Sequence, residues 1–130
     1  MRSTDPGGSA ALNGRRILVV EDEYFLGDDL ARALRRVGAE IVGPIGELAE
    51  ALQALDAPGT IDAAVLDINL RGEMAFPVAR TLRERGVPFV FATGYGQATI
   101  EPEFGDVPRW EKPFDADALA RAMPDLVRPF

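Results

Sequence analysis

The 130-residue chain is 47% hydrophobic and 27% charged, which is typical of one globular domain with a hydrophobic core. Its formal net charge of −7 at pH 7 argues against nucleic acid or an anionic membrane as a direct partner, and no apolar run approaches the roughly 20 residues of a membrane span. Neither cysteine nor histidine occurs, which excludes disulfides, thiol chemistry and His-ligated zinc, leaves a hard cation with oxygen ligands as the expected kind of metal, and agrees with a cytoplasmic location.

Short apolar runs alternate along the chain with segments of helical periodicity. The apolar runs predict strands at residues 16–20, 40–43, 63–67, 88–92 and 107–111. The periodic segments predict helices at residues 24–37, 47–55 and 75–85, and from the N-cap at 115 onward. This alternation is typical of a three-layer α/β fold, in which a doubly wound parallel sheet carries helices on both faces.

Three segments depart from the regular pattern. Residues 1–14 are rich in glycine, serine and other small residues, and we interpret them as a flexible leader before a single domain at 15–130. Pro44 is expected to close the second strand. Residues 97–107 are polar and interrupted by proline, so at most a short or mobile fourth helix is expected there.

Asp67 ends the central predicted strand, which is apolar throughout and therefore expected to be buried on both faces. In a parallel sheet all carboxyl ends meet at one edge, and this edge is where open α/β sheets bind ligands. The polar residues that follow the other strands should converge there with Asp67. These residues are Glu21, Asp22, Thr93 and Lys112.

Crowded carboxylates repel one another, and a divalent cation together with an ammonium group relieves that repulsion. Asp22 and Asp67 are candidate Mg²⁺ ligands, together with the backbone carbonyl of Asn69. Glu21 is expected to reach the metal mainly through water. Lys112 supplies a movable positive charge. With the charge neutralised in this way, the carboxylate of Asp67 can attack a phosphoryl group and form an aspartyl phosphate.

Four motifs resemble, in their order and spacing, those of response-regulator receiver domains. They lie at residues 17–23, 65–67, 92–94 and 111–114. The resemblance implies the flavodoxin-like strand order 2-1-3-4-5. It also implies that the protein is a phosphoacceptor with self-catalysed phosphoryl transfer, and not an enzyme that turns over a separate substrate.

The resemblance also implies individual roles at the site. Asp67 is the phosphoacceptor, and the acidic metal pocket lies beside it. Lys112 pairs with the phosphoryl group, and Thr93 moves to a phosphoryl oxygen and reports the change in charge. Gly94 matches the small residue beside the approach path.

Residues 88–96, Pro-Phe-Val-Phe-Ala-Thr-Gly-Tyr-Gly, are similar to the motif of the FATGUY receivers, a group of single-domain regulators. This similarity implies that a sensor histidine kinase, often of the HWE type, is the phosphodonor. The absence of histidine agrees, because the phosphohistidine must come from another molecule. A downstream protein is then expected to read the surface formed by residues 93–125 once phosphorylation changes it.

One position departs from the receiver pattern. Receivers carry a rotating aromatic residue three positions before the lysine, and Arg109 stands there in this chain. Tyr95 is a candidate substitute, because it follows Thr93 by two residues. Tyr95 and Asn69 are also expected to set the lifetime of the phosphoryl group, since both flank the path of an attacking water.

Three other functions remain open at this point. A phosphatase of the haloacid-dehalogenase class also uses a strand-end Asp and Mg²⁺, but it needs a second Asp where this chain has Asn69. A flavin-binding module would need a phosphate loop after the first strand, where three acidic residues stand instead. A pseudo-receiver would bind its partners without phosphorylation.

Overall fold

The computed structural model describes residues 11–94 and 100–126. Its sheet is formed by five parallel strands, β1 (Arg16–Val20), β2 (Glu40–Ile45), β3 (Ala63–Asp67), β6 (Phe89–Thr93) and β7 (Arg109–Glu111). The α-helices in these ranges are α1 (Tyr24–Arg36), α2 (Leu48–Asp56), α3 (Phe76–Glu84) and α4 (Ala116–Leu126). The strand order β2-β1-β3-β6-β7 confirms the predicted α/β class and the implied order 2-1-3-4-5. Within the described ranges, no helix is both long and apolar enough to cross a membrane.

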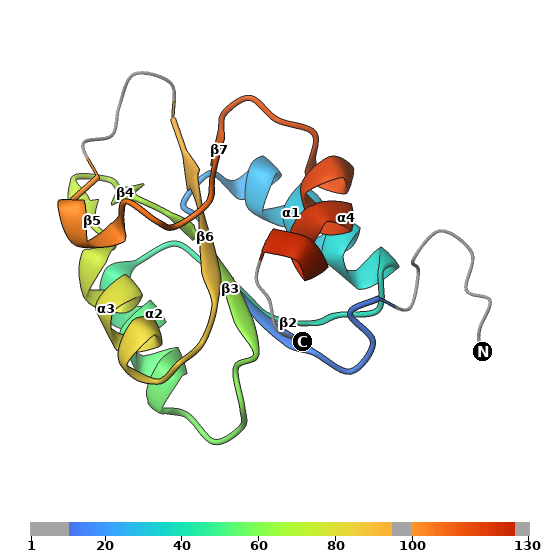
Figure 1. The fold of residues 1–130 in the computed structure, drawn as a ribbon, viewed down its shortest axis with the longest axis horizontal. Helices are drawn as coiled ribbons and strands as arrows, with labels where there is room; N and C mark the ends of the chain where they lie inside the picture. The colour runs from blue at the N-terminus through green and yellow to red at the C-terminus, as the bar shows by residue number, and fades with distance from the viewer. Residues whose placement is uncertain (1–10, 95–99, 127–130) are drawn as a thin grey trace.

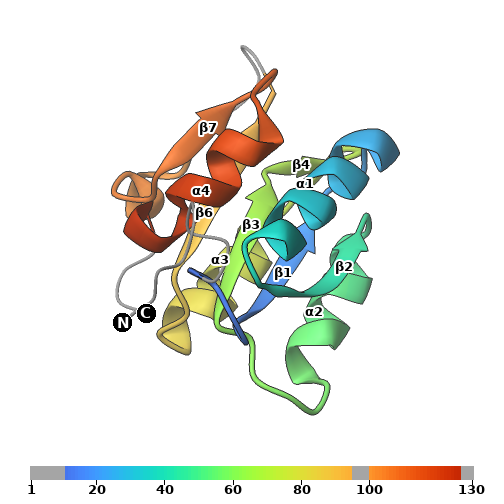
Figure 2. The ribbon, with the colours of Figure 1, turned by 90° about the vertical axis from the view of Figure 1, so that its right-hand side faces the viewer.

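The helices form two layers, one on each face of the sheet (Figures 1 and 2). Helices α1 and α4 pack together on one face, and α2 and α3 pack together on the other. Successive side chains of a strand point to opposite faces. Ile17 and Val19 of β1 therefore pack beneath α1 and α4. Leu18 and Val20 pack beneath α2 and α3.

Strand β2 is longer than predicted, because it continues through Pro44 to Ile45. It lies at one edge of the sheet and, among the described strands, pairs with β1 alone. Proline lacks a backbone N–H, and an edge strand tolerates that loss because one of its sides has no ladder to maintain. The expectation that Pro44 closes the strand is therefore wrong.

The ordered structure begins before residue 15. Residues 11–14, which we assigned to a flexible leader, form a turn. Leu12 is fully buried, and its backbone N–H donates to the carbonyl of Val37 at 2.9 Å. A single large apolar side chain in a stretch of small residues has no periodicity, so the composition did not reveal this anchor. Residues 1–10 lie outside the described residues.

A hairpin that the sequence did not predict follows β3. It pairs β4 (Asn69–Leu70) with β5 (Glu73–Met74) in antiparallel register. In the turn between them, the backbone N–H of Gly72 donates to Oδ1 of Asn69 at 2.6 Å. Arg71 has a φ of 55°, in the left-handed region that non-glycine residues seldom adopt. The hairpin thus fixes a charged residue just beyond the end of the central strand.

Between β6 and β7, the described residues contain one short 3₁₀ helix, η2 (Pro102–Phe104), in agreement with the weak helical signal. Phe104 is fully buried, and its ring stacks on that of Phe76 with centroids 5.6 Å apart. From α3, the guanidinium of Arg83 lies 5.4 Å from the centroid of the Phe104 ring. Arg83 also donates a hydrogen bond to the carbonyl of Glu103 at 2.7 Å. These contacts anchor η2 to α3.

We predict that Phe104→Ala lowers the free energy of unfolding by about 3–5 kcal/mol, because it leaves a cavity among packed aromatic rings. Urea denaturation measures this change. Phe25→Ala is the matched control, since Phe25 is 80% exposed, and its effect should stay within about 0.5 kcal/mol. Equal losses in the two variants would contradict the anchoring role of Phe104.

Candidate functional site

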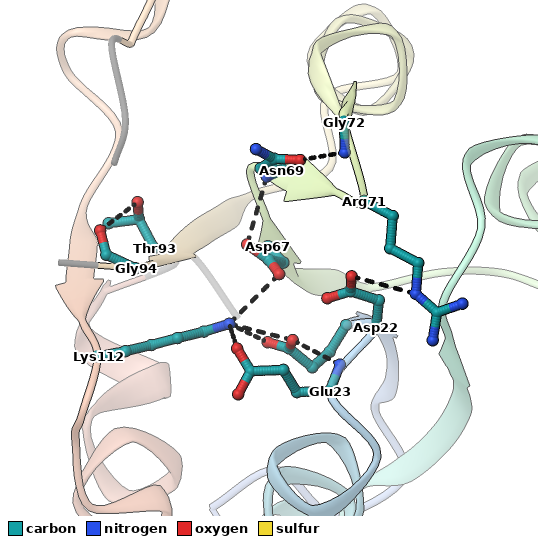
Figure 3. Close-up of polar contacts among 10 residues, drawn as sticks. Asp22, Glu23, Asp67, Asn69, Arg71, Gly72, Thr93, Gly94 and Lys112 are labelled. Atoms are coloured by element: carbon teal, nitrogen blue, oxygen red, sulfur yellow. Dashed lines mark hydrogen bonds and ion pairs between the residues drawn. The ribbon is translucent and has the colours of Figure 1, made fainter. Parts of the chain in front are cut away.

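The carboxylates and the lysine that were predicted to converge lie together at the carboxyl edge of the sheet (Figure 3). Asp67 is the last residue of β3, Glu21 and Asp22 directly follow β1, and Lys112 directly follows β7. Asp67 and Glu21 are each only 3% exposed. Because carboxylates are rarely buried without a partner, the groups around these two decide what the site can do.

The ammonium group of Lys112 is the positive centre of the cluster. It donates hydrogen bonds to Oδ2 of Asp67 at 3.3 Å, to Oε2 of Glu21 at 3.1 Å and to Oε2 of Glu23 at 2.9 Å. The Lys112 side chain is 12% exposed, so its charge-assisted bonds to the buried Glu21 and Asp67 lie largely out of water, where such bonds are strong. The contact with Glu23, whose side chain is 63% exposed, was not predicted.

The acidic cluster has the oxygen ligands that a hard cation needs. Glu21, Asp22 and Asp67 place one carboxylate oxygen each within 4.8 Å of the others. Oε1 of Glu21 is buried and accepts no hydrogen bond from any described residue, although Nζ of Lys112 lies 3.0 Å from it. Mg²⁺ takes one or two carboxylates together with carbonyl oxygens and water. The residues present therefore fit Mg²⁺, and they lack the nitrogen and sulfur ligands that softer metals prefer.

Of the remaining predicted site residues, Asn69 contacts Asp67 directly, and Thr93 and Gly94 lie at the end of the neighbouring strand. The backbone N–H of Asn69 donates to Oδ1 of Asp67 at 3.3 Å. Thr93 ends the neighbouring strand and is buried. Its hydroxyl donates to the carbonyl of Gly94 at 3.4 Å, and no hydrogen bond between Thr93 and Asp67 is present among the described residues. Tyr95 lies outside the described residues.

A second cation, Arg71, lies at the rim of the cluster, and it was also not predicted. Its Nε atom is 3.7 Å from Oδ2 of Asp22, and its side chain is 78% exposed. The sequence carried a trace of both missed contacts. Glu23 extends the acidic pair by one residue, and Arg71-Gly72 follows the central strand as a turn. Neither pattern tells where the side chain points.

The pKa values show how burial and charge oppose each other here. Burial, reinforced by the charge of Asp67, raises the pKa of Glu21 from 4.5 to about 8, against the effect of Lys112. Burial also raises the pKa of Asp67, although Lys112 opposes the shift. Burial alone would lower the pKa of Lys112, but its hydrogen bond to Glu23 and the charge of Asp67 outweigh burial and raise it. Without a metal, the cluster therefore favours a proton on Glu21 and a charged Lys112.

These shifts predict that the protein loses stability as the pH rises, in buffer that contains a chelator. The folded state holds the Glu21 proton more tightly than the unfolded chain, because the folded pKa is the higher one. The resulting stability is complete below pH 4.5 and is lost as the pH rises through about 8. Glu21→Gln, which cannot ionise, should flatten this decline and be the more stable protein above pH 8. Urea denaturation at each pH measures the slope.

Glu84→Gln is the matched control, because Glu84 is an exposed residue of α3. It should keep the wild-type slope. If the stability of Glu21→Gln falls with pH as steeply as that of the wild type, the loss of stability does not come from the raised pKa of Glu21.

The comparisons with known proteins point to one family. A scan of protein-family models finds no match to the chain. The chain is 32% identical over 113 residues to the sensory transduction protein LytT of Bacillus subtilis, and the alignment covers 83% of this chain and 46% of LytT. The chain spans about half the length of the curated relatives it matches.

Three of the matching solved structures are covered over nearly their whole length. SdrG from Sphingomonas melonis is 40% identical with a TM-score of 0.70, and the match covers 86% of this chain and 95% of SdrG. A response regulator receiver protein from Sinorhizobium medicae is 28% identical with a TM-score of 0.72, over 88% of this chain and 95% of that protein. TrrA from Thermotoga maritima, a response regulator solved in complex with Mg²⁺-BeF, is 26% identical with a TM-score of 0.71, and the match covers 87% of this chain and 99% of TrrA.

The chain that these matches cover has the strand order β2-β1-β3-β6-β7 and a lysine that bonds to a buried strand-end carboxylate. A likeness that covers almost all of a solved neighbour at 40% identity extends beyond the fold to the sequence itself. The chain belongs to the receiver domains of two-component response regulators.

Proposed function

We propose that this receiver accepts a phosphoryl group on Asp67 from a sensor histidine kinase, with Mg²⁺ bound in the acidic pocket. One observation carries the proposal. The carboxylate of Asp67 is buried at the end of the central strand, 3.3 Å from the ammonium of Lys112 and within a cluster of three carboxylates. A nucleophilic oxygen, a cation for the phosphoryl charge and a set of metal ligands thus meet within one site.

The transfer is a displacement at phosphorus. An Oδ atom of Asp67 forms the new P–O bond, and the P–N bond to the imidazole of the donor phosphohistidine breaks. The imidazole nitrogen that leaves takes up a proton from water. Lys112 then pairs with a phosphoryl oxygen, and hydrolysis later returns the Asp67 carboxylate and inorganic phosphate. Little covalent chemistry is required of the protein, because alignment and charge neutralisation supply most of the catalysis.

The metal ligands in this proposal are the carboxylates of Asp22 and Asp67 and the backbone carbonyl of Asn69, with Glu21 acting through water. When bound there, Mg²⁺ would neutralise charge on the phosphoryl group and on the carboxylates. The acidic cluster and the Mg²⁺ in the related TrrA structure support this assignment. The raised pKa of Glu21 supports it as well, because a dication would offset the burial and the repulsion from Asp67 that favour the proton.

Thr93 and Gly94 have proposed roles in response to phosphorylation. The Thr93 hydroxyl, now hydrogen-bonded to its neighbour, would turn toward a phosphoryl oxygen of Asp67. The small Gly94 would leave room beside the approach path. The change would then spread over the surface formed by residues 93–125, to be read by a downstream protein. The motif at residues 88–96 favours a FATGUY-type regulator and an HWE-type kinase as its donor.

The competing functions are less well supported. A haloacid-dehalogenase-like phosphatase needs a general acid two residues after the nucleophile, and an amide at Asn69 cannot deliver a proton. A flavin module would place a phosphate next to Glu21 and Asp22, which would repel it. A pseudo-receiver would have no use for the buried contact between Asp67 and Lys112.

The direct test is to incubate the protein with Mg²⁺ and a small acyl phosphate and to measure its intact mass. The wild type should gain the mass of one phosphoryl group, and Asp67→Asn should gain none. Asp56→Asn, which removes an exposed carboxylate at the C-terminal end of α2, should be labelled like the wild type. Omitting Mg²⁺ should suppress the labelling.

An unlabelled wild type would overturn the proposal and favour the pseudo-receiver. Continued release of phosphate from a phosphomonoester, at many turnovers per molecule, would instead favour the phosphatase.

The proposed lifetime residues give a second prediction. Tyr95→Ala should speed the loss of the phosphoryl label severalfold, because Tyr95 follows Thr93 by two residues and is expected to flank the path of the attacking water to Asp67. A time course of intact mass after removal of the donor measures the rate. Phe25→Ala, another loss of an aromatic ring, should leave the rate unchanged. Identical rates for Tyr95→Ala and the wild type would exclude Tyr95 as a lifetime residue. Asn69→Ala tests the second position in the same way.

A further inference from the structure

Two cations face the acidic cluster, and they divide its carboxylates between them. Lys112 pairs with Glu21, Glu23 and Asp67. Among the described residues no ion pair joins Lys112 to Asp22, and the cation that faces Asp22 is Arg71, at 3.7 Å. Asp22 is 15% exposed, so its charge is partly withdrawn from water and a nearby cation stabilises it.

Backbone geometry places Arg71 where it can do this. It occupies a left-handed position in the turn between β4 and β5, with a φ of 55°. The turn is held by the hydrogen bond from Gly72 to the side chain of Asn69. From this turn the Arg71 side chain extends toward Asp22, as Figure 3 shows. The side chain therefore starts from a turn held by a hydrogen bond and is itself 78% exposed.

Arg71 also lies beside open space. The residues that line a hollow of about 310 Å³ include Glu21, Asp22, Tyr24, Asp28 and Arg71. The guanidinium can therefore leave Asp22 for solvent without displacing a packed side chain. Lys112 differs in this respect, because it is 12% exposed and bonded to three carboxylates.

We propose that Arg71 is a tethered counter-ion that neutralises Asp22 in the metal-free protein and competes with a divalent cation for it. This inference rests on the proposed function, in which Asp22 is a Mg²⁺ ligand. A dication next to Asp22 repels the guanidinium, so metal binding must weaken or break the Arg71–Asp22 pair. Arg71 thereby lowers the affinity of the site for Mg²⁺ and sets the concentration at which the receiver is ready for phosphorylation.

The size of the effect follows from the exposure of the pair. Solvent screens an ion pair whose cation is largely exposed, and such pairs contribute little to a binding equilibrium. Arg71→Gln should therefore bind Mg²⁺ roughly two- to fivefold more tightly than the wild type at low ionic strength. The difference should shrink at about 0.5 M salt, because the Debye length is then shorter than about 5 Å.

Isothermal titration of the full chain with MgCl₂ measures the dissociation constant directly, without phosphorylation. Arg85→Gln is the matched control for net charge, since Arg85 pairs with Asp56 instead of the cluster, and it should keep the wild-type constant. Arg71→Lys retains a positive charge in the same turn and should also bind Mg²⁺ like the wild type. Urea denaturation shows whether each variant is folded.

Equal constants for Arg71→Gln and the wild type would overturn the inference while leaving the proposed function intact. A gain in affinity shared by Arg71→Lys would overturn it too, because the effect would then come from the backbone of the turn. If the wild type binds no Mg²⁺ at all, both the inference and the proposed metal site fail.

Discussion

The site depends on the contacts that Lys112 makes. Its ammonium group bonds to two buried carboxylates, Glu21 and Asp67, and to the more exposed Glu23. Removing charges from water is costly, and the attraction between them repays that cost only where geometry and hydrogen bonds are good. Burial raises the pKa of both buried acids even with the lysine present. Lys112 therefore does not fully compensate the negative charge of the two buried carboxylates. A further positive charge at the cluster would stabilise them.

The fold buries these carboxylates because helices cover both faces of its sheet. Helices on both faces bury every residue of β3, from Ala63 to Asp67. A carboxylate in a strand buried on both sides cannot turn away to solvent, so the groups that pair with Asp67 must lie at the carboxyl edge of the sheet. The parallel arrangement brings those partners from β1 and β7 to the same edge. The apolar core and the charged site are thus two consequences of one topology.

The sequence predicted two kinds of feature: those that repeat along the chain and those that stand at the end of a strand. Periodic apolar runs predicted the strands and helices, and strand ends predicted that Asp67 and Lys112 would meet. Features that depend on one side chain were not predictable, because neither the burial of Leu12 nor the direction in which the Glu23 side chain points follows from a repeating pattern. The left-handed turn at Arg71 is of the same kind, since a short charged turn after a strand has many conformations.

Thr93 at the end of β6 and Phe104 of η2 precede β7 along the chain, and their side chains are held differently. Thr93 is buried at the carboxyl end of β6, and within the described ranges its hydroxyl donates one long hydrogen bond, to the next carbonyl at 3.4 Å, which holds it weakly. Phe104 is stacked among aromatic rings beneath α3 and covered by Arg83. Packed cores switch between discrete arrangements and do not deform continuously. A signal that starts at Thr93 must therefore leave Phe104 in place or displace it completely, which favours an all-or-none change at the proposed output surface.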